Sequence, residues 1–299
     1  MIVTEIYHGQ GLGNQLACYI TTRVVAKDKG YKFGIKNPWK FKCLDFLDLD
    51  FGEEVIGGII GREGQPPITL PEGIQYYYRE GESWHPNGSD IRIDDPLLEQ
   101  IQDHTKLDGV FQSENRIIHR KEEIREWLRI RPEKECYTFS QDDVCVINFR
   151  GGDYAGTPDF FLNKKYWEDS IRIMSEKYPG INYIVVTDDP PLARTFFPSY
   201  PVVHNSIGED YSIIKNAYHL ILSNSSFPYF PVLCNEKVQE VLAPKYWGRY
   251  NISDGYWHCG YNIFRGHTYI DREGGLFSYE ECVKEFEEYK KNNNHLWKK

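Results

Sequence analysis

The sequence has no excess of basic charge and no cysteine spacing typical of a metal site. Its 299 residues include 35 Lys and Arg against 44 Asp and Glu, which gives a formal net charge of −9. We therefore expect no nucleic acid polymer as a partner, because its phosphates attract basic surfaces. The seven cysteines are scattered and odd in number, so neither a zinc site nor a disulfide framework is predicted.

Long hydrophobic runs are also missing. No stretch of about 18 consecutive apolar residues occurs, so no integral membrane segment is predicted, and peripheral contact with a membrane stays open. Residues 1–5 have neither the basic nor the apolar region of a signal peptide. These absences lead us to expect a cytoplasmic protein.

What the sequence does have is the composition and length of a globular protein with two domains. Hydrophobic residues make up 40% of it and charged residues 26%, a balance typical of folded domains. The chain is long enough for two domains, and the polar stretch 132–141 marks a boundary. We predict α/β domains at 1–138 and 139–299, the last helix of the second being free to pack back on the first.

The first domain begins with the pattern of a nucleotide-binding unit. Residues 2–7 predict a strand, residues 8–15 a glycine-rich turn, and residues 16–29 a helix. Such a loop presents backbone N–H groups to a phosphate, although the spacing is not that of the dinucleotide fingerprint. Taken alone, the stretch around Gly11 and Gly13 is also consistent with a plain tight turn.

The remaining elements follow from apolar periodicity. In the first domain, strands are predicted at 31–35 and 107–111 and a helix at 117–131, with irregular structure over 37–100. In the second, strands are predicted at 144–147, 183–187, 200–203 and 220–222, helices at 164–177 and 210–219, and a last helix from a capping box at 278–281. This alternation predicts an α/β fold.

The central predicted strand of the second domain ends abruptly in polar residues. Its apolar run is followed by Asn148, Arg150 and Asp153, with Gly151 and Gly152 between them. Ligands of open α/β sheets bind beyond the carboxyl ends of the strands, and an arginine beside two glycines suits an anion such as a diphosphate. The structural alternative is that Arg150 forms a salt bridge to Asp153 in an ordinary turn.

Two further polar clusters end predicted strands. Asp188 and Asp189 follow one strand, where they could also cap a helix, and Ser225 and Ser226 follow another, where they could also form a turn. For proton transfer in the loop after the central strand, Asp153 and Asp159 are the candidate general bases.

Together with Asn14, these clusters occur in the order found in a known enzyme family. The chain resembles the bacterial α-1,2-fucosyltransferases and their relatives among the α-1,6- and protein O-fucosyltransferases. The matching motifs lie at residues 10–15, 148–154, 187–189, 210, 224–230 and 243–247. Residues 37–110 contribute almost nothing to the resemblance.

The resemblance implies a GT-B fold, in which two Rossmann-like domains face each other across a cleft, the first on the acceptor side and the second binding the donor. It implies inverting, metal-independent transfer of fucose from GDP-fucose to a hydroxyl of a glycan acceptor. Arg150 would stabilise the departing GDP, Asn14 would approach the reacting centre, and Asp153 is the third candidate catalytic residue. The donor-binding residues implied by the resemblance are Gly11, Gly13, Asn148, Asp188, Asp210, Ser225, Ser226 and Phe227. Neither a metal nor another cofactor is expected.

The chain departs from the family pattern at three places. Asn148 stands where the family has histidine, Gly151 replaces the second arginine of a pair, and Tyr229 and Phe230 replace two tryptophans. Two alternatives therefore stay open. The protein could use another nucleotide sugar, or it could be a non-catalytic relative that binds a nucleotide or sugar.

Overall fold

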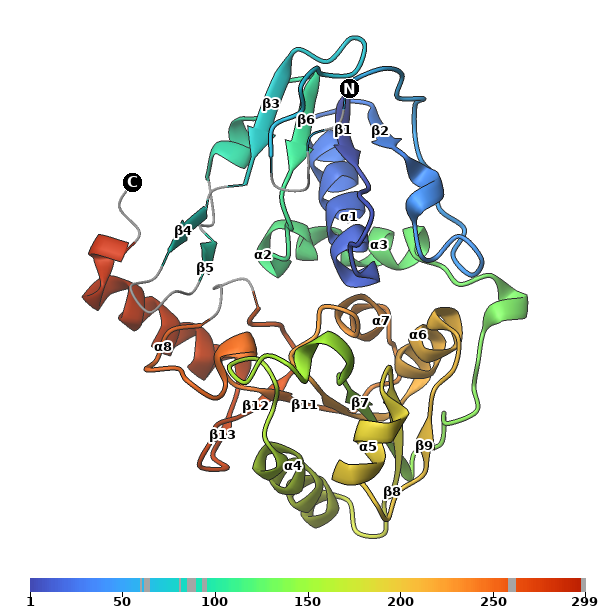
Figure 1. The fold of residues 1–299 in the computed structure, drawn as a ribbon, viewed down its shortest axis with the longest axis vertical. Coiled ribbons are helices and arrows are strands. Elements are labelled where there is room, and N and C mark those ends of the chain that lie inside the picture. The colour runs from blue at the N-terminus through green and yellow to red at the C-terminus, as the bar shows by residue number, and fades with distance from the viewer. Residues whose placement is uncertain are drawn as a thin grey trace.

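The computed structural model describes residues 1–59, 61, 65–80, 82–84, 90–92, 96–257 and 262–296. The chain forms two α/β halves, each built on its own sheet (Figure 1). The N-terminal sheet has the strand order β2-β1-β6-β3 and is parallel throughout. The C-terminal sheet has the order β13-β12-β11-β10-β7-β8-β9, in which β13 pairs antiparallel to β12. The predicted α/β fold, with two Rossmann-like parts facing each other as in GT-B enzymes, is confirmed.

The N-terminal half is assembled around β1 and α1. Its elements are β1 (Ile2–Glu5), α1 (Leu12–Asp28), β2 (Phe33–Lys36), η1 (Pro38–Lys40), β3 (Tyr76–Arg79), β4 (Glu82–Trp84), β5 (Asp90–Arg92), η2 (Pro96–Gln100), β6 (Thr105–Asp108), α2 (Glu114–Ile117), η3 (Ile118–Arg120), α3 (Lys121–Trp127) and η4 (Pro132–Lys134). The predicted glycine-rich turn was too long, since α1 begins at Leu12 instead of residue 16. Gly11 is the N-cap in extended conformation, so Gly13 and Asn14 lie in the first helical turn.

The C-terminal half alternates strands and helices as predicted. Its elements are β7 (Val144–Phe149), η5 (Gly152–Tyr154), α4 (Lys164–Lys177), β8 (Asn182–Thr187), α5 (Pro190–Phe196), β9 (Val202–Val203), α6 (Ile207–Asn216), β10 (His219–Leu222), α7 (Tyr229–Leu233), β11 (Glu240–Pro244), η6 (Trp247–Arg249), β12 (Thr268–Ile270), β13 (Leu276–Phe277), α8 (Tyr279–Asn292) and η7 (Asn294–Leu296). Helix α6 begins before residue 210 because Ser206 and Glu209 form a capping box that the sequence analysis missed.

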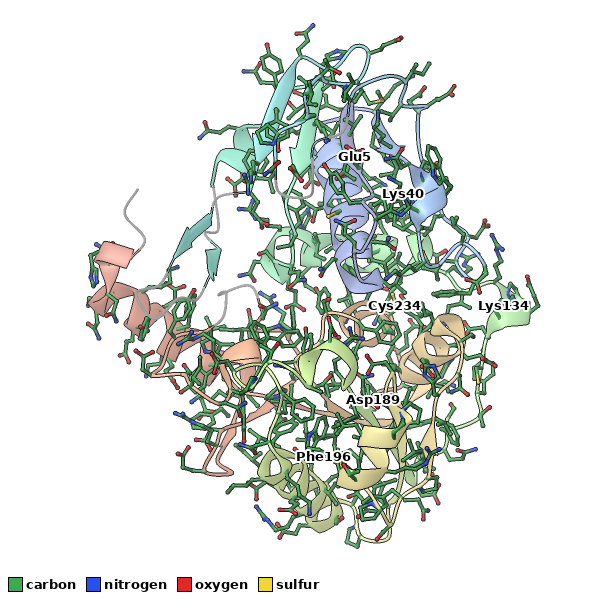
Figure 2. All side chains as sticks on the ribbon, viewed as in Figure 1. Glu5, Lys40, Lys134, Asp189, Phe196 and Cys234 are labelled. Atoms are coloured by element: carbon green, nitrogen blue, oxygen red, sulfur yellow. The ribbon has the colours of Figure 1, made fainter. Side chains whose placement is uncertain are left out.

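Helices cover both faces of the C-terminal sheet. On one face, α4 and α5 pack on β7 and β8 through Trp167 and Phe197. On the other, α6 and α7 pack through Ile213, Ile214 and Val232. Figure 1 shows α6 and α7 in the layer that faces the N-terminal half. In Figure 2, Phe196 lies in the layer away from that half and Cys234 at the boundary.

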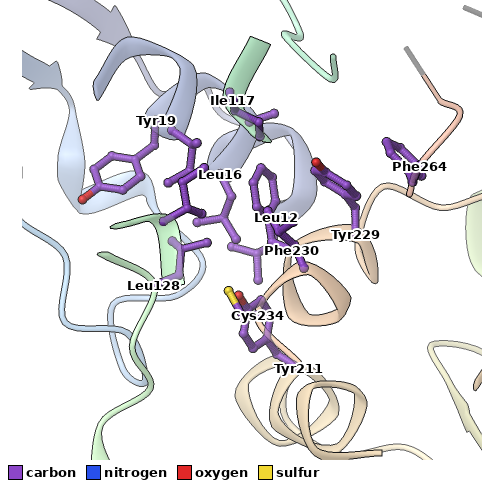
Figure 3. Close-up of a cluster of buried hydrophobic side chains, with 14 of the residues drawn as sticks. Leu12, Leu16, Tyr19, Ile117, Leu128, Tyr211, Tyr229, Phe230, Cys234 and Phe264 are labelled. Carbon is purple, nitrogen blue, oxygen red and sulfur yellow. The ribbon is translucent and has the colours of Figure 1, made fainter. Parts of the chain in front are cut away.

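An apolar cluster joins the two halves, and we call it the interdomain core (Figure 3). It brings α1 and α3 against α6 and α7. Its members include Leu12, Leu16, Tyr19, Ile117, Leu128, Tyr211, Tyr229, Phe230, Cys234 and Phe264. Because burial of apolar surface stabilises roughly in proportion to the area removed from water, this cluster holds the halves in one relative position.

The last helix begins where the sequence predicted it. Ser278 and Glu281 form the expected capping box of α8. The helix contacts β12, and Glu285 binds both Lys245 and the Tyr246 hydroxyl at 2.7 Å. These contacts lie within the C-terminal half. Among the described residues, no helix combines the length and apolar character needed to cross a membrane.

Candidate functional site

A pocket of about 440 Å³ lies between the two halves. Its lining from the N-terminal half is Gly9, Gln10, Gly11, Leu12, Gly13, Asn14 and Lys42. Its lining from the C-terminal half is Asn148, Phe149, Arg150, Asp153, Tyr154, Val186, Thr187, Asp188, His204, Asn205, Ile207, Asp210, Ser225, Ser226 and Phe227. All the candidate catalytic and donor-binding residues implied by the family resemblance therefore line this one pocket.

The first turn of α1 touches the C-terminal half directly. A Cβ added to Gly13 would lie 2.3 Å from the carbonyl oxygen of Ser226, so only glycine fits there. The Ser226 hydroxyl donates to Asn14 Oδ1 at 3.0 Å, and Gln112 Nε2 donates to the same oxygen at 2.6 Å. These contacts fix the N-terminal end of α1, with its backbone N–H groups, at the pocket.

Arg150 lies between two carboxylates at the end of β7. Its guanidinium is 2.6 Å from Asp153 and 2.5 Å from Asp188, and it lies over the Tyr154 ring at 5.4 Å from the ring centre. The salt bridge to Asp153 that the structural alternative named is thus present, and Asp188 is a second partner that the sequence analysis did not pair with Arg150. The side chain is still 34% exposed, and its buried Nε has no hydrogen-bond partner. Donor capacity is left for a ligand, since a guanidinium carries five N–H groups.

The two glycines after Arg150 are required by the neighbouring carboxylates. A Cβ at Gly151 would lie 2.6 Å from Cβ of Asp189, and one at Gly152, where φ is +35°, would lie 2.5 Å from Asp188 Oδ2. Asp188 also accepts the Gly151 N–H at 2.9 Å. Asp189 caps α5 by accepting from the Leu192 N–H. The capping alternative therefore holds for Asp189, whereas Asp188 lines the pocket.

Short polar side chains lie near the end of β7 and just after β10. Asn148 is buried and accepts from the Ser223 hydroxyl at 3.3 Å. Ser225 accepts the Phe227 N–H at 3.2 Å, so the predicted turn role is present. The Ser225 hydroxyl hydrogen is not used in that bond and can be donated to a ligand oxygen.

Asp210 lies in the first turn of α6 and is 9% exposed. Burial raises the pKa of its carboxyl to about 6, although a hydrogen bond from Asn205 and the nearby His204 act in the opposite direction. Asn205 Nδ2 donates to Asp210 Oδ1 at 2.9 Å. His204 Nδ1 is 2.8 Å from the carbonyl oxygen of Thr187, so this nitrogen carries a hydrogen, since a carbonyl only accepts. The sequence analysis missed both His204 and Asn205.

The two candidate general bases differ in position. Asp153 lines the pocket, whereas Asp159 is exposed and outside the lining. Asp48 and Asp50 form an Asp-x-Asp sequence, a pattern of metal-dependent transferases that we took to be absent from the sequence. Both lie outside the lining. Asp50 accepts a hydrogen bond from the Gly52 N–H and forms an ion pair with Arg23. Within the described part of the chain, no group of three or more His, Cys, Asp or Glu side chains could hold a metal ion.

No family model and no curated protein matches the chain. Solved structures that it resembles include the fucosyltransferase NodZ from Bradyrhizobium, at 12% identity over 80% of this chain and 94% of that one, with a TM-score of 0.42. A mutant of Arabidopsis thaliana FUT1 in complex with GDP gives 10% identity over 81% and 69%, with a TM-score of 0.46. A family 9 glycosyl transferase from Veillonella parvula gives 11% identity over 96% of each chain, with a TM-score of 0.47. At these low values, the interpretation of the site depends on the chain's own geometry.

Proposed function

We propose that the pocket binds a nucleotide sugar and that the protein is an inverting, metal-independent glycosyltransferase. The donor is GDP-fucose, and fucose is transferred to a hydroxyl of a glycan acceptor. One observation carries the proposal. The N-terminal end of α1, the guanidinium of Arg150 and the carboxylate of Asp210 come from distant parts of the chain and meet at one pocket.

The diphosphate and the base of the donor each find a chemical partner in the lining. The N-terminal end of a helix and an arginine both favour a diphosphate, and Ser225 can add a hydroxyl donor. At the base, Asp210 can accept from the two adjacent N–H donors on the guanine edge, a pattern that uracil lacks. Asn148 offers a further amide nearby. These pairings support a guanine nucleotide over a uracil one.

The proposed reaction breaks the bond between the sugar's anomeric carbon and the diphosphate oxygen. The acceptor hydroxyl attacks the anomeric carbon from the opposite face, and its oxygen forms the new glycosidic bond. Negative charge then grows on the departing diphosphate, where Arg150 stabilises it. The proton of the acceptor hydroxyl passes to a base, for which Asp153 is the candidate carboxylate at the pocket.

One observation favours a non-catalytic nucleotide-binding protein as a second candidate. Arg150 is paired with both Asp153 and Asp188 before any ligand enters, so its positive charge is offset. A catalytic Arg150 must turn part of its guanidinium toward the diphosphate. Turnover of GDP-fucose with a glycan acceptor separates the two candidates, because a non-catalytic protein binds the nucleotide and transfers no fucose to the acceptor.

The donor is tested by thermal denaturation with GDP, UDP and ADP, each with and without EDTA. A ligand present at 100 times its Kd stabilises the native state by about 2.7 kcal/mol. We expect GDP to raise the melting temperature equally in both buffers. Loss of the GDP effect in EDTA would contradict metal-independent binding, and tenfold tighter binding of UDP would contradict the guanine donor.

A further inference from the structure

The pocket lining has more carboxylates than cationic side chains, although the proposed ligand is an anion. The lining has three carboxylates, from Asp153, Asp188 and Asp210, against the two cationic side chains of Arg150 and Lys42. Arg150 is already paired with two of the carboxylates. Among the described residues, no carboxylate pairs with the Lys42 ammonium. A diphosphate entering this pocket therefore meets one cation that is not neutralised.

The backbone of Lys42 is held at the pocket by buried residues on either side and by hydrogen bonds from Gln15. Lys42 is exposed, whereas Phe41 and Cys43 on either side of it are 5% and 0% exposed and belong to the interdomain core cluster. Gln15 fixes the backbone on both sides, because its Nε2 donates to the Lys40 carbonyl at 2.9 Å and its Oε1 accepts the Lys42 N–H at 3.0 Å. Gln15 directly follows Asn14 in the first turn of α1, so the same turn that lines the pocket also positions Lys42.

The segment that carries Lys42 is also anchored to the C-terminal half. Phe46 packs against Tyr211 of α6, with ring centres 5.3 Å apart. A Cβ at Gly208 would lie 2.8 Å from the Phe46 ring, so the two segments are in close contact. Asp210 lies between these two contacts on α6. The segment that carries Lys42 is therefore held in a fixed position relative to both halves of the molecule.

We infer that Lys42 is a donor-binding residue that contacts the diphosphate from the N-terminal half. The inference rests on the proposed function and names a residue that the sequence analysis did not consider. Position 151, next to Arg150 in the chain, has no room for a second cationic side chain, because Gly151 lies against Asp189. The additional positive charge comes from the other half of the molecule, where Lys42 extends from a fixed backbone.

The test is the affinity of the full-length protein for GDP, measured by calorimetry at several salt concentrations. We expect Lys42→Gln to weaken GDP binding on the order of tenfold, the scale for losing a hydrogen bond between charged groups. The slope of log Kd against log salt should become shallower, because one charged contact has been removed. Lys42→Arg should keep most of the affinity. Lys40→Gln is the matched control, since Lys40 lies on the same segment but outside the lining, and it should bind GDP as the wild type does.

The outcomes separate this inference from the proposed function. If the wild type does not bind GDP, the proposed function fails and the role of Lys42 fails with it. If the wild type binds GDP and Lys42→Gln binds it equally well with the same salt slope, the inference alone is overturned. An equal loss in Lys40→Gln would also overturn it, because the effect would then belong to the general charge of the segment. Thermal melting of the unliganded variants verifies that each one is folded.

Discussion

The hydroxyl of Ser226 donates to the Oδ1 atom of Asn14 across the boundary between the two halves, at 3.0 Å. The two residues are 212 positions apart in the chain. Beside them, Gly13 lies against the Ser226 backbone without space for a side chain. The glycine-rich motif at the start of α1 is thus a contact between halves as well as part of the pocket, and this double role can be tested.

We expect Gly13→Ala to destabilise the protein by about 1–3 kcal/mol, the usual cost of forcing an extra carbon into packed structure. The added Cβ would meet the Ser226 carbonyl oxygen at 2.3 Å, and relief requires α1 and the Ser226 turn to move apart. Urea denaturation monitored by circular dichroism measures the effect. Gly156→Ala is the control, since a Cβ there meets nothing within 4 Å. Equal stability of the two variants would contradict the close contact.

Arg150→Ala should reduce turnover by roughly 10²-fold or more, the scale for losing one preorganised charge that stabilises the transition state. The fold should stay intact, because Asp188 keeps its bond to the Gly151 N–H. Arg150→Lys should restore little, since an ammonium cannot reproduce a two-pronged contact with phosphate oxygens. Melting temperature and turnover are measured on the same preparations. Unchanged turnover per folded molecule in Arg150→Ala would end the catalytic assignment.

Donor affinity should depend on pH through Asp210. The pKa of its carboxyl is raised to about 6 by burial, so below that pH it is protonated and accepts guanine's hydrogens poorly. We expect GDP-fucose to bind more tightly as pH rises through about 6, and Asp210→Asn to remove this dependence. GDP-fucose is a better probe than GDP, because its diphosphate does not titrate in this range, unlike a terminal phosphate with a pKa of about 6. A pH profile identical in both proteins would contradict the role of Asp210.

The raised pKa of the Asp210 carboxyl also predicts how the free energy of unfolding changes with pH. In the unfolded chain, the Asp210 carboxyl has its ordinary pKa of 3.8, and in the native state its pKa is about 6. Between these values the native state binds more protons, so the free energy of unfolding falls as pH rises through this window. Above it, the buried carboxylate is a net cost. Asp210→Asn should therefore be less sensitive to pH between 4 and 6 in urea denaturation.

An arginine introduced at position 151, where the family pattern has one, should not strengthen phosphate binding. Gly151→Ala already places its Cβ against Asp189, so we expect it to be destabilising, and Gly151→Arg more so. A double-mutant cycle tests the cause. Asp189→Gly removes the obstructing Cβ and costs only a few tenths of a kcal/mol as an N-cap change. In that background Gly151→Ala should be tolerated, and additivity of the two changes would show that the contact does not matter.

Local patterns predicted much of the fold. The bounds of α4 agree with the sequence, because Asn163 caps its start and the apolar period is regular, and α8 follows from its capping box. Strands β11, β12 and β13 were missed. Strand β11 is buried throughout and lies between β10 and β12 in the sheet. Its place as a strand is therefore set by pairing with these two neighbours and not by an alternating pattern of its own.

The sequence predicted which residues form the site, but not which of them interact with one another. Motif positions brought Arg150 and Asp188 to the site, but their ion pair depends on the register between β7 and β8, which the sequence does not display. Lys42 was missed for a similar reason. Its segment has no strand or helix pattern that points to the pocket, and its position depends on Gln15.

The interdomain core has a consequence for how ligands leave. Relative domain motion is expected when the interface between domains is small or polar, and here Leu16, Phe230 and Cys234 are among the buried apolar side chains that fill it. Separating the halves would expose this surface to water. We therefore expect a bound molecule to enter and leave by local movement at the mouth of the pocket, and the halves to unfold as one calorimetric unit. Exchange rates should follow substitutions at the rim of the pocket, and heating should give one melting transition for the whole chain.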